Sequence, residues 1–100
     1  MKEYEVVFYE KEDGTHPALD YIASLSLKMR MPYSEFLKDG IFQIRAQQEG
    51  NISRVLYFFA VGKRIVLTNG FTKKTPKTPL GEIELAKEYR ADYERREALK

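Results

Sequence analysis

The stretch SRVLYFFAVGKRIVLTNG, residues 53–70, decides the fold. It divides into two runs rich in β-branched and aromatic residues, 53–60 and 64–70, which the Gly62-Lys63 pair separates. Such runs predict strands, and a short connection between them favours antiparallel pairing. Apolar residues occupy both alternating sets of positions in the first run, so we expect both faces of that strand to be covered.

Two more strands are predicted before this hairpin. Residues 4–9 are rich in β-branched and aromatic side chains and continue into a polar turn over 11–14. Residues 41–46 form the other strand, and Gly50-Asn51 provides the turn that follows it. Together with the hairpin, these strands predict a mostly antiparallel sheet.

A helix is predicted between the two early strands, from Pro17 to about residue 30. Proline suits the first position of a helix, and an apolar stripe at helical spacing supports the interpretation. The stripe consists of Leu19, Ile22, Leu25 and Met29. Pro32 and the Asp39-Gly40 pair then bound a polar connection that cannot easily be helical throughout.

A last helix is predicted to run to about residue 97. Thr78 is a plausible N-cap, Pro79 the first helical position, and Glu82 favours the start through the helix dipole. Asp92 and Arg96 are expected to pair on the outer side of the helix. The expected buried stripe is Ile83, Ala86, Tyr89 or Arg90, and Tyr93. The order β-α-β-β-β-α predicts a small α+β domain with helices packed on the sheet.

The composition bounds the class of protein. One hundred residues, of which 43% are hydrophobic, predict a single domain over 1–100. The absence of cysteine excludes disulfides, thiolate metal sites and a cysteine nucleophile. We expect a capping or surface role for His16, the only histidine, and predict no metal and no cofactor. Residues 1–5 lack a signal-peptide pattern and the apolar runs are short, so we expect a soluble, cytoplasmic protein.

Positive charge is concentrated in the middle of the chain. Residues 41–78 carry seven basic residues and one acidic residue, whereas 1–40 and 79–100 are net acidic and the whole chain is +2. The basic residues of this segment are Arg45, Arg54, Lys63, Arg64, Lys73, Lys74 and Lys77. Clustered cations are typical of a surface that binds a polyanion such as nucleic acid; a solvated basic region is the alternative.

Five of these cations could be brought to one concave surface by an antiparallel sheet. They are Arg45, Arg54, Lys73, Lys74 and Lys77. Arginine and lysine can stabilise the phosphorane that forms when an RNA 2′-hydroxyl attacks the adjacent phosphate, and they can assist the proton transfers without a metal. Non-catalytic phosphate contacts are the alternative interpretation of the same residues.

Several segments resemble a known family. The most specific is Gly-Phe-Thr-Lys-Lys-Thr-Pro-Lys-Thr-Pro over 70–79, followed by Glu-Ile at 82–83. Together with Asp-Gly-Ile-Phe-Gln-Ile-Arg over 39–45, this sequence resembles the HigB-like, phage-derived branch of the RelE toxin superfamily. The resemblance covers most of residues 32–93, and residues 4–30 fit the family's opening strand and helix more loosely.

The resemblance implies the toxin of a type II toxin–antitoxin pair, an endoribonuclease that cleaves mRNA, commonly on the ribosome, and so inhibits translation. Its partner would be an antitoxin, which often carries a helix-turn-helix. The resemblance places Arg45 and Arg54 on the sheet that faces RNA. The candidate catalytic residues are Arg54, Lys73 and Lys74, and the candidate RNA-binding residues are Arg45, Lys63, Arg64 and Lys77. The family's active-site tyrosine has no match here, so the general base is not identified.

The sequence departs from the family between its first helix and the stretch over 32–37. Members normally place a second antiparallel helix there, whereas Arg30-Met31-Pro32 joins the two segments directly. The stripe of the first helix therefore loses a neighbour, and we expect a homodimer through this helix. In the competing arrangement, the stripe is covered by a fold-back of Tyr33, Phe36 and Leu37.

Two other classes of function stay open on the sequence. A non-catalytic module could bind nucleic acid or the ribosome with the same basic surface, for example if the deletion had abolished activity. A phage-borne interaction protein with a protein partner is favoured by the acidic first forty residues.

Overall fold

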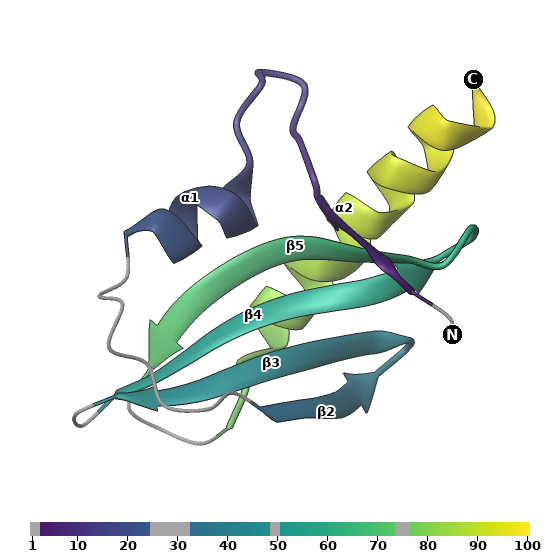
Figure 1. Cartoon of the computed structure of the whole chain (residues 1–100). Coiled ribbons are helices and arrows are strands. Elements are labelled where there is room, and N and C mark those ends of the chain that lie inside the picture. Colours follow the sequence, from purple (N-terminus) through teal and green to yellow (C-terminus); the bar gives the residue numbers. More distant parts are fainter. Residues whose placement is uncertain (1–2, 25–32, 49–50, 74–76) are drawn as a thin grey trace.

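The computed structural model describes residues 3–24, 33–48, 51–73 and 77–100 (Figure 1). It has a five-stranded sheet in the order β1-β5-β4-β3-β2, with β1 parallel to β5 and the other pairs antiparallel. The elements in chain order are β1 (Glu5–Phe8), α1 (Pro17–Ala23), β2 (Tyr33–Lys38), β3 (Ile41–Gln48), β4 (Asn51–Ala60), β5 (Arg64–Lys73) and α2 (Leu80–Ala98). The predicted α+β class and mostly antiparallel sheet are confirmed.

The central strand β4 is covered on both faces, as its sequence predicts. Leu56 and Phe58 belong to a core with Ile83 of α2, while Val55 and Tyr57 belong to a second cluster on the opposite face with α1. In Figure 1, α2 accordingly passes behind the sheet. Because successive residues of a strand point to opposite faces, a strand with two apolar faces is buried throughout.

The predicted polar connection before β3 is wrong in part, because 33–38 form strand β2 at the edge of the sheet. Asp39 and Gly40 have φ angles of 53° and 79° and join β2 to β3. Two positive φ angles make the type I′ hairpin turn that Asp-Gly favours. The chain therefore has the order β-α-β-β-β-β-α, with one strand more than predicted.

A bulge in β5 determines which side chains face α2. Leu56 pairs with Asn69 and Tyr57 with Leu67, so Thr68 is the extra residue. Its hydroxyl donates to the carbonyl of Leu56 at 3.1 Å. Beyond the bulge, Asn69 faces α2, and its amide donates to the backbone oxygen of Glu82 at 3.3 Å and to Oε1 of the same residue at 3.1 Å.

Helix α1 contacts the sheet through a different side than its apolar stripe. Ala18 is buried, and Tyr21 donates from its hydroxyl to the carbonyl of Phe71 at 2.8 Å. The stripe residues Leu19 and Ile22 are instead 39% and 37% exposed. The helix is described only to Ala23, and the predicted continuation with Leu25 and Met29 lies outside the described residues.

The fold-back of 33–37 over this stripe is contradicted. These residues pair with β3 instead, Phe36 is 59% exposed, and Leu37 packs against the core on the α2 side of the sheet. The side chain of Tyr33 lies outside the description. Because β2 lies at the edge of the sheet beside β3, it does not cover the apolar stripe of α1.

Helix α2 confirms the predicted stripe and corrects its start. Ile83 and Ala86 are buried, and Tyr89 and Tyr93 pack against the same core. Pro79 occupies the N-cap position, so the prediction of Thr78 as N-cap is wrong. The Asp92–Arg96 ion pair is present, but it faces Tyr9 and the backbone of Glu10 rather than the outer side of the helix.

Candidate nucleic-acid interface

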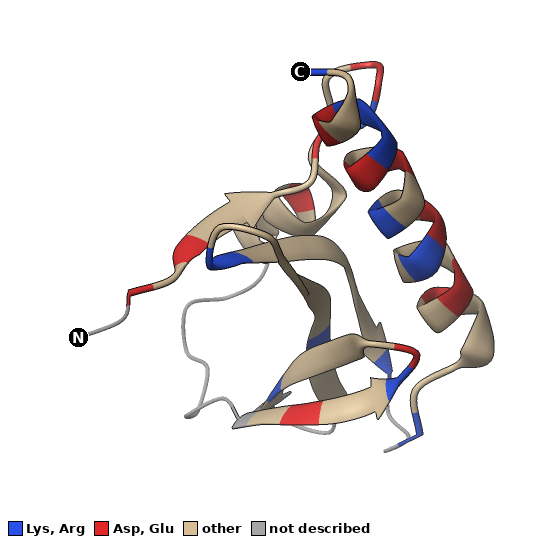
Figure 2. Ribbon diagram, turned by 90° about the vertical axis from the view of Figure 1, so that its right-hand side faces the viewer, with Lys and Arg blue, Asp and Glu red and all other residues tan. Residues whose placement is uncertain are grey.

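Four of the predicted cations lie toward one end of the sheet, near the start of α2. Arg45 of β3 pairs with Arg54 of β4, and Lys73 of β5 pairs with Ile52 of β4. Lys77 is exposed in the segment that leads to α2. Figure 2 shows that basic and acidic positions alternate along α2 itself. Lys74 lies outside the described residues.

The other two RNA-binding candidates lie at the opposite end of the sheet. Lys63 is in the β4–β5 turn with φ 58°, and Arg64 begins β5. Since β5 runs from Arg64 to Lys73, the two ends are about 30 Å apart. Arg64 contacts Glu97 at 2.7 Å and Glu5 at 3.6 Å. Hydrogen bonding to Tyr93 and then Glu97 raises its pKa, so this guanidinium is committed to α2 and β1.

Arg54 is fully buried, with 0% of its surface exposed. It has the same parity along β4 as Leu56 and Phe58 and therefore faces α2, with its guanidinium 5.5 Å from the centre of the Phe71 ring. The expectation that Arg54 lies on an exposed basic surface with the other cations is wrong. A catalytic role for it stays a prediction, and direct contact with a phosphate would require this region to open.

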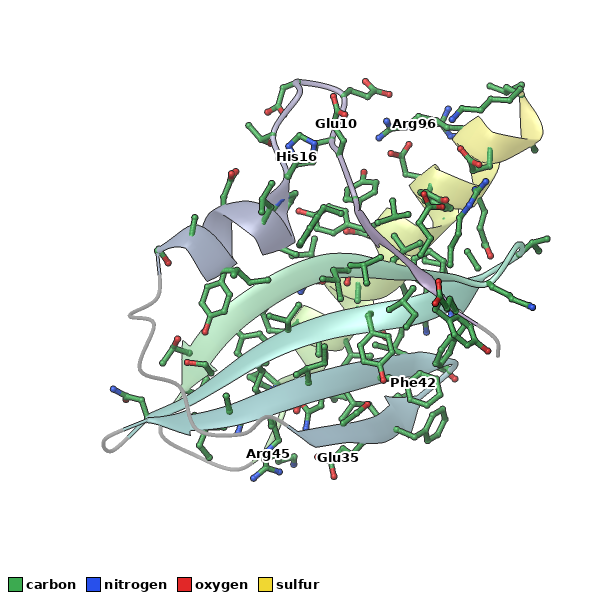
Figure 3. All side chains as sticks on the ribbon, in the orientation of Figure 1. Glu10, His16, Glu35, Phe42, Arg45 and Arg96 are labelled. Carbon is green, nitrogen blue, oxygen red and sulfur yellow. The ribbon has the colours of Figure 1, made fainter. Side chains whose placement is uncertain are left out.

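Arg45 is only 21% exposed and forms an ion pair with Glu35 of β2, at 3.3 Å. Glu35 is 42% exposed, and its Oε1 also accepts a 2.5 Å hydrogen bond from the buried amide of Gln43. The Oε1 of Gln43 in turn accepts from the hydroxyl of Thr78, at 2.7 Å. Figure 3 shows Glu35 and Arg45 close together at the β2 edge of the sheet. This polar network therefore joins β2, β3 and the segment before α2.

Two arginines lie directly opposite each other in the β3–β4 ladder. Residues directly opposite in an antiparallel ladder have Cα atoms roughly 4.5–5.5 Å apart, and like charges in such positions destabilise the pair. Arg45 and Arg54 occupy such positions and share the α2 side of the sheet. Glu35 places a negative charge beside this pair through its contact with Arg45.

Sequence reasoning missed Glu35, Gln43 and Thr78 as members of the site. The sequence pattern predicts a polar connection at Glu35 and therefore gives no indication that Glu35 pairs with Gln43 in the β2–β3 register. The signal that could have found it is the Asp39-Gly40 pair, because Asp-Gly is a strong hairpin signal. That hairpin fixes which β2 side chain lies beside each β3 side chain.

A second polar cluster ties the end of β1 to the last turns of α2. The hydroxyl of Tyr9 donates to Asp92 at 2.6 Å, and Arg96 donates to the same carboxylate and to the carbonyl of Glu10. Burial, then the bond to Asp92, raises the pKa of Tyr9 to about 12. Hydrogen bonds from Arg96 and Tyr9 lower the pKa of Asp92 to about 2. These shifts indicate a structural tie.

His16 lies beside this cluster (Figure 3). It occupies the N-cap position of α1, but its side chain makes no capping hydrogen bond. Its Nε2 lies 3.5 Å from Oε1 of Glu10, and the side chain is partly exposed. The predicted capping or surface role is thus confirmed as a position at the helix start and on the surface, without a cap from the imidazole.

Among the described residues, no group of three or more His, Cys, Asp or Glu side chains is placed to hold a metal ion. Neither described helix is long and apolar enough to cross a membrane.

Comparison with protein families matches residues 11–91 to the family described as Phage derived protein Gp49-like (DUF891). The matched segment contains α1, all strands from β2 to β5 and most of α2. A comparison with curated proteins finds no match. The family match therefore includes every residue of the network that joins Glu35, Gln43, Arg45 and Thr78.

Proposed function

The chain belongs to the family of phage-derived Gp49-like proteins, and from this premise we propose that it is the toxin of a type II toxin–antitoxin pair, of the HigB-like kind. It acts as an endoribonuclease on mRNA, on the ribosome, and thereby inhibits translation. A helix-turn-helix antitoxin is the expected protein partner. The resemblance of residues 70–79 and 39–45 to HigB-like toxins supports this function, as does the family match.

The proposed reaction needs no metal ion. The 2′-hydroxyl of one nucleotide attacks the adjacent phosphate, and cations stabilise the charge that accumulates on the phosphorane. Arg45, Lys73 and Lys77 are the described cations that can reach a bound phosphate from the surface, and Lys74 remains a catalytic candidate by resemblance. Arg54 acts from beneath, through its charge in a region of low dielectric constant.

The observation that carries this proposal is the cross-strand pair of Arg45 and Arg54 beside a polar network. An arginine is rarely fully buried, and Arg54 is buried directly opposite Arg45. Residues that depart from such rules are expected at functional sites. An anionic substrate explains the arrangement.

A non-catalytic module that binds RNA or the ribosome is the second candidate, and the same cations favour it. A reporter mRNA in a translation extract separates the two, because the toxin cleaves the message whereas the binding module inhibits translation and leaves it intact. The double variant Lys73→Ala/Lys74→Ala is expected to abolish cleavage, and Lys11→Ala, at an exposed position after β1, serves as the control.

Unchanged cleavage by a folded Lys73→Ala/Lys74→Ala protein would refute the role of these lysines. Inhibition with intact mRNA would favour the binding module. If the parent neither inhibits translation nor cleaves mRNA, the toxin assignment itself is overturned.

A further inference from the structure

We propose that Glu35 is the general base of the RNA cleavage, a role that rests on the function proposed above. The sequence offers no residue for this role, and within the described residues the structure brings the carboxylate of Glu35 beside Arg45. Glu35 lies on β2, beside Gln43 and Arg45 of β3. A base must lie within hydrogen-bond reach of the proton that it takes, and the phosphate must lie next to it.

One oxygen of Glu35 is held and the other is open. Oε1 accepts from Nε2 of Gln43 at 2.5 Å and from the guanidinium of Arg45 at 3.3 Å. Among the described residues, Oε2 has no hydrogen-bond partner, and the side chain is 42% exposed. Oε2 is therefore available to a hydroxyl group of a bound RNA.

The hold on Oε1 comes from inside the protein. The hydroxyl of Thr78 donates to Oε1 of Gln43, which directs the amide NH₂ of Gln43 toward Glu35. Gln43 and Thr78 are both buried, and buried polar groups with satisfied hydrogen bonds are rigid. An exposed ion pair with Arg45 alone would leave Glu35 mobile, whereas this relay fixes the direction of its carboxylate.

Arg45 connects the base to the substrate. Its guanidinium contacts Glu35, and the planar fork of a guanidinium matches the non-bridging oxygens of a phosphate. Lys77, next to Thr78 in the chain, adds positive charge at the same place. A phosphate bound by Arg45 brings its neighbouring 2′-hydroxyl toward Oε2 of Glu35.

The step balances without a cofactor. Oε2 of Glu35 accepts the proton of the 2′-hydroxyl as the bond between the 2′-oxygen and phosphorus forms. The bond from phosphorus to the 5′-oxygen breaks, and this oxygen takes a proton from solvent water. The products are a 2′,3′-cyclic phosphate and a 5′-hydroxyl, and Glu35 returns its proton to the solvent.

The test is single-turnover cleavage of an RNA by the full chain and by Glu35→Gln. Glutamine keeps an acceptor oxygen for Gln43 and Arg45 but cannot take a proton at neutral pH. We expect a loss of about 100-fold or more in the cleavage rate, with RNA affinity unchanged or tighter because a negative charge is removed. Glu88→Gln, on an exposed position of α2, is the matched control and should cleave like the parent.

A second variant keeps the inference testable if Glu35→Gln fails to fold. Glu35→Ala should be inactive and should regain part of its cleavage rate in added formate, a rescue that a merely structural role does not give. If the parent cleaves RNA and a folded Glu35→Gln cleaves at a rate within threefold of the parent's, the Glu35 assignment alone is overturned. A folded Glu35→Ala whose cleavage formate does not rescue also overturns it. A parent that does not cleave RNA overturns the proposed function and this inference together.

Discussion

The hydroxyl of Tyr9 donates a 2.6 Å hydrogen bond to Asp92, which lies 83 positions further along the chain. Arg96 binds the same carboxylate and lies over the Tyr9 ring, with its guanidinium carbon 5.5 Å from the ring centre. The contact joins the segment after β1 to α2, and the ring of Tyr9 also stacks on that of Tyr89, with 4.6 Å between the ring centres. Its two ionisable groups have shifted pKa values, so its contribution to stability depends on pH at both extremes.

Asp92 is expected to make the protein acid-sensitive. Its pKa is about 2 in the folded chain against an ordinary 3.8, so its stabilisation is complete above about pH 4 and is lost as the pH falls toward 2. The difference in the free energy of unfolding between the parent and Asp92→Asn should therefore shrink over that interval. Urea titrations between pH 5 and 2 measure it, and a constant difference contradicts the role of Asp92.

Tyr9 has the opposite dependence. Its pKa is raised to about 12 from 10.0, so its stabilisation is complete below pH 10 and is lost as the pH rises toward 12. Tyr9→Phe lacks this titration and should show a weaker loss of stability in alkali than the parent. Thermal unfolding between pH 9 and 12 tests this, and parallel curves for the two proteins would count against it.

Gly70 is required by the close approach of α1 to β5. A Cβ at this position would overlap the ring of Tyr21. We expect Gly70→Ala to lower the free energy of unfolding by about 1–3 kcal/mol, and by clearly less in a Tyr21→Ala background. Gly81→Ala is the matched control, because a Cβ there meets no atom within 4 Å. Equal costs in both backgrounds would mean that Tyr21 is not the obstacle.

Arg54 should now be tested for stability as well as activity. Because its guanidinium is buried over Phe71, Arg54→Lys replaces a planar, stacked cation with a strongly hydrated ammonium. We expect a loss of about 2 kcal/mol or more in the free energy of unfolding. Lys73→Arg exchanges the same two residue types at an exposed position and should change stability by less than about 0.5 kcal/mol. An unfolding free energy of Arg54→Lys equal to that of the parent contradicts the buried position.

The homodimer through α1 stays a prediction. The exposed side chains of Leu19 and Ile22 provide an apolar surface through which two copies could associate. Burial of about 400 Å² of apolar area would be worth on the order of 10 kcal/mol before the cost of association. Sedimentation at micromolar concentration should show a dimer for the parent and a monomer for Leu19→Gln/Ile22→Gln. A monomeric parent removes the proposal.

The sequence predicted those parts of the fold whose signals are local. The two-sided apolar pattern of β4 and the turn at Gly62-Lys63 were sufficient for the central hairpin, and the stripe from Ile83 to Tyr93 was sufficient for α2. The edge strand β2 was missed because its residues include Ser34, Glu35 and Lys38, which read as polar. Leu37, its apolar residue on the α2 side, can be assigned to the core only when the β2–β3 register is known.

The candidate site was harder to predict than the fold, because it depends on which face each cation occupies. Arg54 precedes Leu56 and Phe58 at alternate positions, so its burial was already implied by the strand pattern, yet charge alone favoured the surface. Glu35 and Thr78 meet Gln43 only through tertiary structure. Conversely, Arg64 and Lys63 belong to the basic segment in sequence but lie at the other end of the sheet.

The most direct test of the account is an analysis of RNA ends after incubation of mRNA with the purified chain in a translation extract, and with naked RNA in EDTA. The account predicts cleavage with a cyclic or 3′-phosphate on the upstream fragment and a 5′-hydroxyl on the downstream fragment, and EDTA should not prevent cleavage of any RNA that is cut without ribosomes. Products with a 5′-phosphate, or intact RNA under both conditions with a folded protein, would contradict cleavage by 2′-hydroxyl attack at this site.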